Sequence, residues 1–584
     1  MKLIGYHLEV MPEIVRFRLT HIVLWTGILA TTIIAPFSNY DPISLPKLAV
    51  ISLGSISALF LLILYRKSFI NSHKSIVLLL SGFVFWMLLV LLFSGAPLEQ
   101  QIWGMFGRNT GLVAYFSLAS LMLASCISSS DNYDFARRLS NSVIGVSIFE
   151  TLYCLVQIAK RDPIRWSEMQ PFGTLGNVNF LSAFLGISTV IILNQIVGKD
   201  TRSLWRFALT GLLIVQLYVI EFTGSIQGLM MFAVGSAVSI LFRIASSRYA
   251  KFAIPSVVSG FSVVGIISAF ALFNKGPLAG FIYQPSIVFR WDYMHAGIEM
   301  TQQFPVFGVG LDSYGDWYRQ LRGEISTLRT GPDRVSNSAH NIFLDISSNG
   351  GLPLISIYLA LVIWASIGCY RLWIRSKTIF NPWHAALVAS WIAYQVQALI
   401  SINQLGVGVW AWILTGTLIS FSSSKFQNIE SSFTTLRTNS DNKKTFNKSK
   451  DVSAARRKLK GELMPAKASL VAFSGAAIGM ALCLPALVSD SAVYRAFQTG
   501  DAVKMVNSLK GVGVTAWHME VVLDDTVKKN DAGLASEVIS FLKEKFPRDY
   551  YAYYIEYMSA TASQSDRNVA LTVLKSLDPY NPNI

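Results

Sequence analysis

Apolar runs of about 18 or more residues without a charged side chain constrain this chain most strongly. Such runs occur, among other places, at 48–65, 75–93 and 252–273. At 1.5 Å per residue, a helix of this length crosses a hydrocarbon core of ~30 Å. Only 14% of the 584 residues are charged, whereas soluble domains carry roughly 25%. The sequence therefore predicts an all-α fold, a polytopic membrane helix bundle with about 12–13 transmembrane helices.

Basic residues concentrate in alternate connections between the expected spans. We expect spans at about 19–36, 46–65, 75–93, 111–128, 139–159, 178–197, 205–222, 224–243, 252–273, 351–373, 384–402, 405–423 and 468–488. The positive-inside rule assigns the Lys/Arg-rich connections to the cytoplasm. We expect a multi-pass protein of the bacterial inner membrane, with a cytoplasmic N-terminus and an extracytoplasmic C-terminus. The connection 160–177, the loop 274–350 and the tail 489–584 then face outward.

The chain divides into four expected regions. Residues 1–423 form a membrane domain that includes the extracytoplasmic loop 274–350, and 468–488 is the last span. The intervening 424–467 holds eleven Lys/Arg against four Asp/Glu and is expected to be a basic cytoplasmic linker near anionic lipids. Because this linker and the short loops on one side account for most of the net charge of +15, we expect no nucleic-acid partner.

We expect the tail 489–584 to form a small extracytoplasmic α-hairpin domain. Its apolar residues recur at helical spacing between short polar turns. Pro547 and Pro582 stand 35 positions apart, close to the tetratricopeptide period of about 34 residues. We expect a TPR-like tail that is available to a protein partner or a bulky acceptor.

Polar side chains at the outer rim of a membrane bundle are costly and mark candidate sites. The candidates are Arg108, the Lys160/Arg161/Arg165 cluster, Glu221, Arg290, His340 and Asn341. Arginine offers a permanently charged planar fork for phosphate oxygens, and histidine can accept a proton from a hydroxyl near neutral pH. These residue types predict a site for a lipid-linked diphosphate.

Each candidate also has a structural interpretation. His340 could cap or pack at a helix start, and Arg290 could be an interfacial residue that extends toward the head groups. Glu221 could cap an outer helix end. We expect the series Arg319, Arg322, Arg329 and Arg334 to be a solvated surface.

Nucleotide and metal motifs are not found in the sequence. There is no Walker loop, no paired C-x-x-C and no H-E-x-x-H, and the four cysteines lie in apolar runs without ligand spacing. We expect neither a metal nor a cofactor. An enzyme at the outer face of the membrane that has no nucleotide-binding motif needs a substrate that is already activated. A polyprenyl-diphosphate sugar is such a substrate.

Three motifs in order carry a family resemblance. Arg290 is followed by P-V-F-G-V-G at 305–310 and by H-N-I-F-L-D-I-S-S-N-G-G-L at 340–352; GRNTGL at 107–112 and FGTLGNVNFLSAFLG at 172–186 are further stretches. Over most of residues 20–423 the chain resembles the O-antigen ligase and O-antigen polymerase (Wzy) superfamily of membrane glycosyltransferases.

The resemblance implies a metal-independent, inverting transfer from an undecaprenyl-diphosphate-linked glycan to an acceptor hydroxyl. Arg290 would bind the departing diphosphate, and His340 would be the base or the group that orients the acceptor. Arg108, Arg161, Arg165, Glu221 and Asn341 are expected to bind substrate. Many relatives have Ser-Arg-Gly where this chain has Ser225, Ile226, Gln227 and Gly228, so uncharged Gln227 takes the substrate-binding position.

Several functions are compatible with these residues. The transferase could be a ligase, an O-antigen or exopolysaccharide polymerase, or a protein O-oligosaccharyltransferase, with a glycan, lipid or protein acceptor. A transporter or a non-catalytic scaffold of envelope assembly is the alternative of a different class. Few charged residues in the spans and no evident inverted repeat argue against a transporter.

Overall fold

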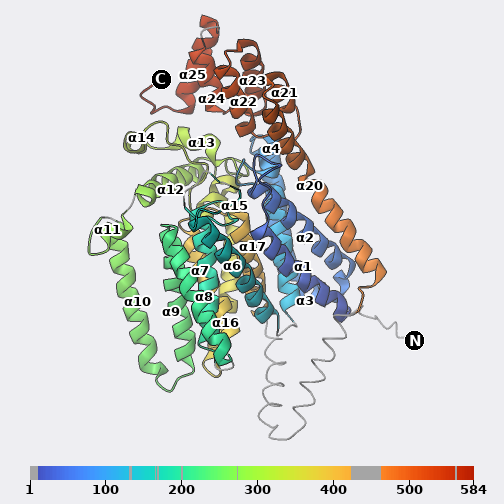
Figure 1. Ribbon diagram of the computed structural model, residues 1–584, viewed down its shortest axis with the longest axis vertical. Coiled ribbons are helices and arrows are strands. Elements are labelled where there is room, and N and C mark those ends of the chain that lie inside the picture. Colours follow the sequence, from blue (N-terminus) through green and yellow to red (C-terminus); the bar gives the residue numbers. More distant parts are fainter. Residues whose placement is uncertain are drawn as a thin grey trace.

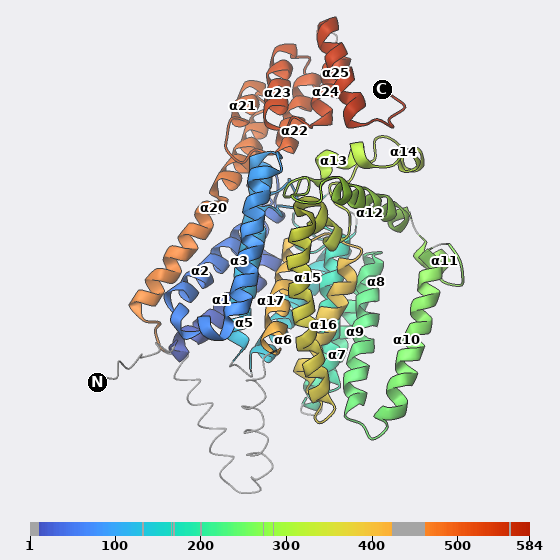
Figure 2. The ribbon, with the colours of Figure 1, turned by 180° about the vertical axis from the view of Figure 1, so that it is seen from behind.

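The computed structural model describes residues 11–130, 134–164, 166, 170–198, 201–272, 274–283, 285–422, 462–559 and 562–584, and these residues form helices and no strand. Eleven helices are long and apolar enough to cross a membrane, which confirms a polytopic membrane helix bundle (Figures 1 and 2). They are α1 (Glu13–Thr32), α2 (Ser44–Leu64), α3 (Ile70–Phe93), α5 (Leu112–Ser129), α6 (Phe135–Ile158), α7 (Val178–Ile196), α8 (Ser203–Phe222), α9 (Ile226–Ala245), α10 (Ala250–Leu272), α15 (Ile342–Ser376) and α20 (Ala466–Thr499).

Two of the thirteen expected spans correspond to shorter helices. They are α16 (Pro382–Ala398), with 17 residues, and α17 (Leu405–Ser420), with 16 residues. Every residue of α17 is buried, and α17 packs against α1, α5 and α15. A helix surrounded by other helices meets protein rather than lipid, so the bilayer thickness does not set its length.

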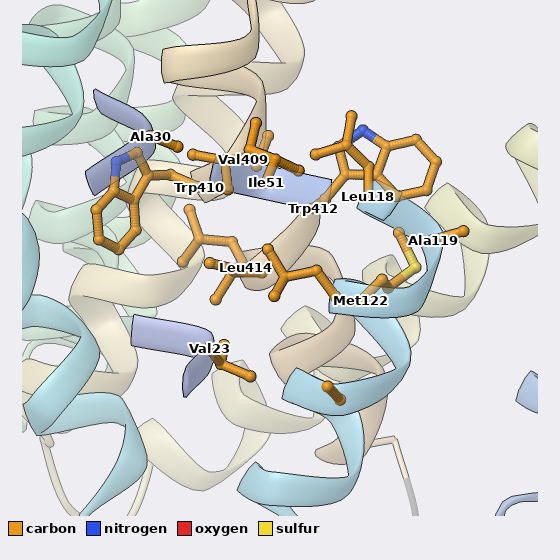
Figure 3. Close-up of a cluster of buried hydrophobic side chains, with 14 of the residues drawn as sticks. Val23, Ala30, Ile51, Leu118, Ala119, Met122, Val409, Trp410, Trp412 and Leu414 are labelled. Carbon is orange, nitrogen blue, oxygen red and sulfur yellow. The ribbon is translucent and has the colours of Figure 1, made fainter. Parts of the chain in front are cut away.

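The core of the bundle lies where α17 meets α1, α2 and α5. Figure 3 shows Trp410 and Trp412 of α17 beside side chains of those helices, such as Leu118. Trp410 is fully buried, and its Nε1 donates to Thr31 Oγ1 at 2.8 Å. A Cβ on Gly27 would lie 2.8 Å from the Trp410 ring, so glycine is needed for this close packing.

α20 packs along α2 through small residues. A Cβ on Gly475 would lie 2.7 Å from the carbonyl oxygen of Ile56, and one on Gly479 would lie 2.5 Å from that of Ser52. Small residues four apart let two helix backbones approach closely. The helix α20 is 34 residues long and ends before Gly500, whose φ is +67°, so it extends beyond both ends of the predicted span 468–488.

The helices of the loop 274–350 and of the tail gather at one end of the bundle, which we call the capped end (Figure 1). The loop contains α11 (Ala279–Ile282), α12 (Pro285–Gln303), α13 (Tyr314–Leu321) and α14 (Glu324–Thr330), and the short α4 (Leu98–Trp103) precedes α5. α10, which leads into the loop, stands at the edge of the bundle (Figure 2), packs on α9 and has no buried residue in its apolar stretch.

The tail is helical, with α21 (Ala502–Ser508), α22 (Ala516–Lys528), α23 (Ala532–Lys545), α24 (Tyr550–Met558) and α25 (Gln564–Leu577). Neighbouring helices pack in pairs, such as α22 with α23 and α24 with α25. The tail has its own apolar core, which includes Val522, Val538 and Leu542. A TPR-like arrangement stays a prediction. Nearly all of the predicted linker 424–467 lies outside the described residues.

Candidate active site

The start of α15 presents His340 at the capped end. Asn341 caps this helix, because its Oδ1 accepts hydrogen bonds from the backbone N–H groups of Phe343 at 3.0 Å and Leu344 at 3.2 Å. His340 precedes the cap with a φ of +51°, which non-glycine residues seldom adopt. Its own N–H donates to Ser338 Oγ at 2.9 Å. The surrounding hydrogen bonds thus hold His340 in an uncommon backbone conformation, of a kind that clusters at functional sites.

The P-V-F-G-V-G turn at 305–310 packs into a break in α15. The helix loses its regular conformation at Gly351, where φ is +74°. The backbone N–H of Val309 donates to the carbonyl oxygen of Ser348 at 2.8 Å. A Cβ on Gly308 would lie 2.4 Å from that same oxygen, so a larger residue could not make this approach. The turn therefore fixes the end of α12 against the helix that begins beside His340.

Arg108 lies buried between two carboxylates. Its Nε is 3.5 Å from Asp312 Oδ1 and its Nη2 is 3.5 Å from Asp345 Oδ2, while Nη1 donates to the carbonyl oxygen of Asn337. Burial opposes the charged form, but Asp312 and Asp345 outweigh it and raise the pKa of the Arg108 guanidinium. Arg108 therefore ties the GRNTGL segment to Asp312 and Asn337 of the loop and to Asp345 of α15. Because the two acids compensate its charge, it offers no excess positive charge to a ligand.

Arg290 on α12 has the opposite environment. It is 8% exposed, yet no hydrogen bond or ion pair joins its guanidinium to another of the described residues. Burial lowers the pKa of Arg290, and nearby Tyr293 only partly opposes this effect. A buried charge without a partner is unfavourable. The position is therefore suited to an anionic ligand.

The His340 ring packs on Tyr293 and lies close enough to Arg290 to feel its charge. The centroids of the His340 and Tyr293 rings are 5.2 Å apart with an interplanar angle of 32°, and no described residue makes a hydrogen bond to either ring nitrogen of His340. Burial, with the positive charges of Arg290 and Arg108, lowers the pKa of His340 to about 3. The imidazole is therefore neutral at pH 7, with one nitrogen free to accept a proton and the other carrying one.

Of the four remaining predicted substrate-binding residues, the structure describes three. Arg161 is exposed after the end of α6, Glu221 is exposed in the last turn of α8, and Arg165 lies outside the described residues. Gln227 is buried, and its Oε1 accepts a hydrogen bond from Gln397 Nε2 at 3.2 Å. In the described part of the chain, no hydrogen bond or ion pair joins any of these side chains to Arg290 or His340.

The prediction of a solvated arginine series is wrong for Arg322. This side chain is fully buried, and its Nη2 lies 2.7 Å from Asp578 Oδ2 in the tail. Arg319 also pairs with Asp578, at 3.0 Å. The reason is tertiary, since the compensating carboxylate is 256 positions away from Arg322 in the sequence.

Three residues of the site were missed by the sequence reasoning. They are Tyr293, which packs on His340, and the two carboxylates that pair with Arg108. Asp312 lies two positions after the P-V-F-G-V-G motif, and Asp345 lies inside the motif at 340–352. An acid close to a turn or a helix cap is the sequence signal that could have identified both. With Tyr115, Arg108 and these acids line a small cavity. The described residues contain no group of three or more His, Cys, Asp or Glu that could hold a metal ion.

Comparison with known proteins places a family domain over this site. Residues 211–359 match the model of the O-antigen ligase family, and no curated protein matches the chain. The matched segment runs from α8 into α15 and includes Gln227, Arg290, His340 and Asn341 but not Arg108. This match confirms the expected superfamily: the chain is a multi-pass membrane protein that carries an O-antigen ligase family domain over residues 211–359.

Proposed function

We propose that this protein transfers a glycan from an undecaprenyl-diphosphate donor to an acceptor hydroxyl at the capped end of the bundle. The observation that carries the proposal is Arg290, a buried guanidinium with no acidic partner among the described residues. A diphosphate supplies the missing negative charge, and arginine matches its oxygens with charge-assisted hydrogen bonds. Arg108 cannot play this part equally well, because Asp312 and Asp345 already neutralise it.

In the proposed reaction the acceptor oxygen attacks the anomeric carbon of the donor glycan. The new carbon–oxygen bond forms on the face opposite the diphosphate, so the anomeric configuration inverts. The bond between that carbon and the diphosphate oxygen breaks, and the diphosphate leaves with the electron pair. Arg290 stabilises the charge that develops on the leaving group. His340 accepts the proton of the acceptor hydroxyl.

Donor binding should also improve His340 as a base. In the protein alone, the charge of Arg290 helps to lower the pKa of His340 to about 3, and an imidazole with so low a pKa takes up protons weakly. A diphosphate against Arg290 adds negative charge beside the ring and opposes that effect. The pKa of His340 should therefore rise toward its ordinary range when the donor is bound.

The proposed setting is the extracytoplasmic face of a bacterial inner membrane. The distribution of Lys and Arg supports this orientation through the positive-inside rule. It puts the N-terminus in the cytoplasm, and the loop 274–350 and the tail 489–584 outside. The basic segment 424–467 would then be a cytoplasmic linker between the membrane domain 1–423 and the last span.

Transfer by the purified chain tests the proposal. The full chain in lipid nanodiscs is mixed with an undecaprenyl-diphosphate oligosaccharide and, separately, with glycan, lipid and protein acceptors, and the products are followed by mass spectrometry. We expect Arg290→Ala and His340→Ala to reduce transfer by at least about 100-fold, as expected when a group that stabilises transition-state charge or moves a proton is lost.

Two matched variants control for nonspecific effects. His295→Ala removes an exposed histidine from the same α12 helix, where it lies 4.0 Å from Glu299, and Arg495→Ala removes an exposed arginine from α20. Both should retain full transfer. Membrane-inserted Arg290→Ala and His340→Ala proteins that transfer at the unaltered rate would show that the enzyme proposal is wrong.

A further inference from the structure

Asp578, directly after α25, is a buried carboxylate that the proposed reaction does not use. Its side chain is inaccessible to solvent and lies 2.7 Å from Arg322 Nη2 and 3.0 Å from Arg319 Nη1, both on or next to α13. Asn581 Nδ2 donates to the same carboxylate at 3.2 Å. The tail thus places one fully buried acid against two arginines of the loop.

The same two arginines hold the segment that leads to His340. Arg322 donates from Nη2 to the carbonyl oxygen of Pro332 at 2.9 Å and from Nη1 to that of Arg334 at 3.0 Å. Arg319 Nη1 also donates to the carbonyl oxygen of Pro332, at 2.9 Å. These carbonyl groups lie at the start of the segment 332–340, which ends at His340. One carboxylate in the tail therefore orders the donors that fix one end of this segment.

The other end of the segment 332–340 is held from within the bundle. The carbonyl oxygen of Asn337 accepts from Arg108. The backbone N–H of Ala339 donates to Asp345 Oδ1 at 2.8 Å. The position of His340 thus depends on two anchors, one made by Arg108 and Asp345 and one made through Asp578.

We propose that Asp578 is a positioning residue, through which the C-terminal tail sets the place of His340 in the donor site; this rests on the proposed function. Removing the carboxylate would leave Arg322 buried without a compensating charge. Because a buried, unpaired guanidinium is unfavourable, Arg322 must turn toward water. It then releases the carbonyl oxygens of Pro332 and Arg334, and the segment 332–340 loses one of its two anchors.

A second contact joins the tail to the Arg108 segment. The rings of Trp517 in α22 and Phe106 stack with centroids 3.8 Å apart and planes 8° apart, and Phe106 lies two positions before Arg108. The next tail residue, His518, bonds through Nε2 to Asp490 Oδ1 at 2.9 Å. The tail therefore contacts the loop through Asp578 and the Arg108 segment through Trp517. These are the two parts of the protein that hold the segment 332–340, which agrees with a role in positioning.

Hydrogen–deuterium exchange of the full chain in nanodiscs tests this role, with Asp578→Asn as the main variant. We expect faster exchange in peptides that cover 331–341, together with a fall of about tenfold or more in kcat, because the misplaced His340 is the proposed base. The unfolding temperature should also fall, because Arg322 loses its buried partner. A merely structural role would instead spread the faster exchange over the whole tail and leave the kcat of the folded protein unchanged. Asp578→Glu keeps the carboxylate and should restore most of kcat.

Asp524→Asn is the matched control, because it makes the same chemical change in an exposed ion pair with Lys528 in the tail. It should leave both readouts unchanged. If Asp578→Asn does not reach the membrane, Arg319→Met removes one of the two ties to Pro332 from a side chain that is 19% exposed. Unchanged exchange at 331–341 in whichever variant is recovered overturns the positioning role.

The two proposals can fail separately. Exchange at 331–341 is measured without substrate, so it reports on positioning even if the chain transfers no glycan. If exchange at 331–341 is faster in Asp578→Asn but the wild-type chain does not turn over the donor, the proposed transferase function is wrong and the positioning of the loop by the tail still holds. If exchange at 331–341 is unchanged in Asp578→Asn and the wild-type chain does turn over the donor, only the positioning role is wrong.

Discussion

Replacing Arg290 with methionine should stabilise the protein and weaken donor binding at the same time. Methionine has nearly the length of arginine but carries no charge. Arg290 is 8% exposed and has no acidic partner among the described residues, so in the absence of donor its charge opposes folding. Buried ion pairs replaced by apolar side chains of similar volume often leave stability unchanged or increase it by about 1–4 kcal/mol, and Arg290 has no ion-pair energy to lose. We expect Arg290→Met to increase the free energy of unfolding by about 1–3 kcal/mol.

The same substitution removes the proposed diphosphate contact. A hydrogen bond to a charged group contributes about 1.5–3 kcal/mol, which corresponds to a loss of roughly 10- to 150-fold in affinity. At a ligand concentration of about 100 Kd, bound ligand stabilises the folded protein by about 2.7 kcal/mol; if Kd weakens about 100-fold, the same concentration stabilises it by only about 0.4 kcal/mol.

Thermal unfolding in nanodiscs, with and without undecaprenyl diphosphate, measures both effects. The wild-type chain should have the lower midpoint without ligand and the larger shift with it. Arg290→Met should have the higher midpoint without ligand and almost no shift. A variant that is less stable than the wild type and keeps the full ligand shift would refute the inference that Arg290 is an unpaired anion-binding cation.

Two further predictions concern the same site. Arg108→Ala should lower the free energy of unfolding by about 3–5 kcal/mol, measured by the same unfolding assay, because it leaves Asp312 and Asp345 buried without their cation; a neutral effect would contradict the structural role of Arg108. Because the pKa of His340 is about 3 without donor, kcat/KM for the donor should show no titration of this residue between about pH 5 and 8. In contrast, kcat should fall as pH decreases through the higher pKa of the donor complex, where protonated imidazole cannot accept a proton, and a pH-independent kcat would contradict donor-dependent basicity.

Hydropathy and local motifs determined much of the fold. A membrane-spanning helix satisfies its backbone hydrogen bonds within one segment, so its position can be predicted from a single stretch of sequence. Eleven of the expected spans have long apolar helices in the structure. The break in α15 at Gly351 and the turn at 305–310 both coincide with glycines of the motifs at 340–352 and 305–310. The helix α20 also continues past the predicted span to Thr499, although Pro485 lies inside it.

The electrostatic state of each arginine was decided by tertiary structure alone. Arg108, Arg290 and Arg322 are the same residue type, yet the first lies between two acids, the second has no acidic partner among the described residues, and the third is buried against Asp578. Their partners come from segments up to 256 positions away. Charge on a side chain is a property of the sequence, but its compensation depends on distance in space, which only the packing of the loop, the tail and the bundle sets.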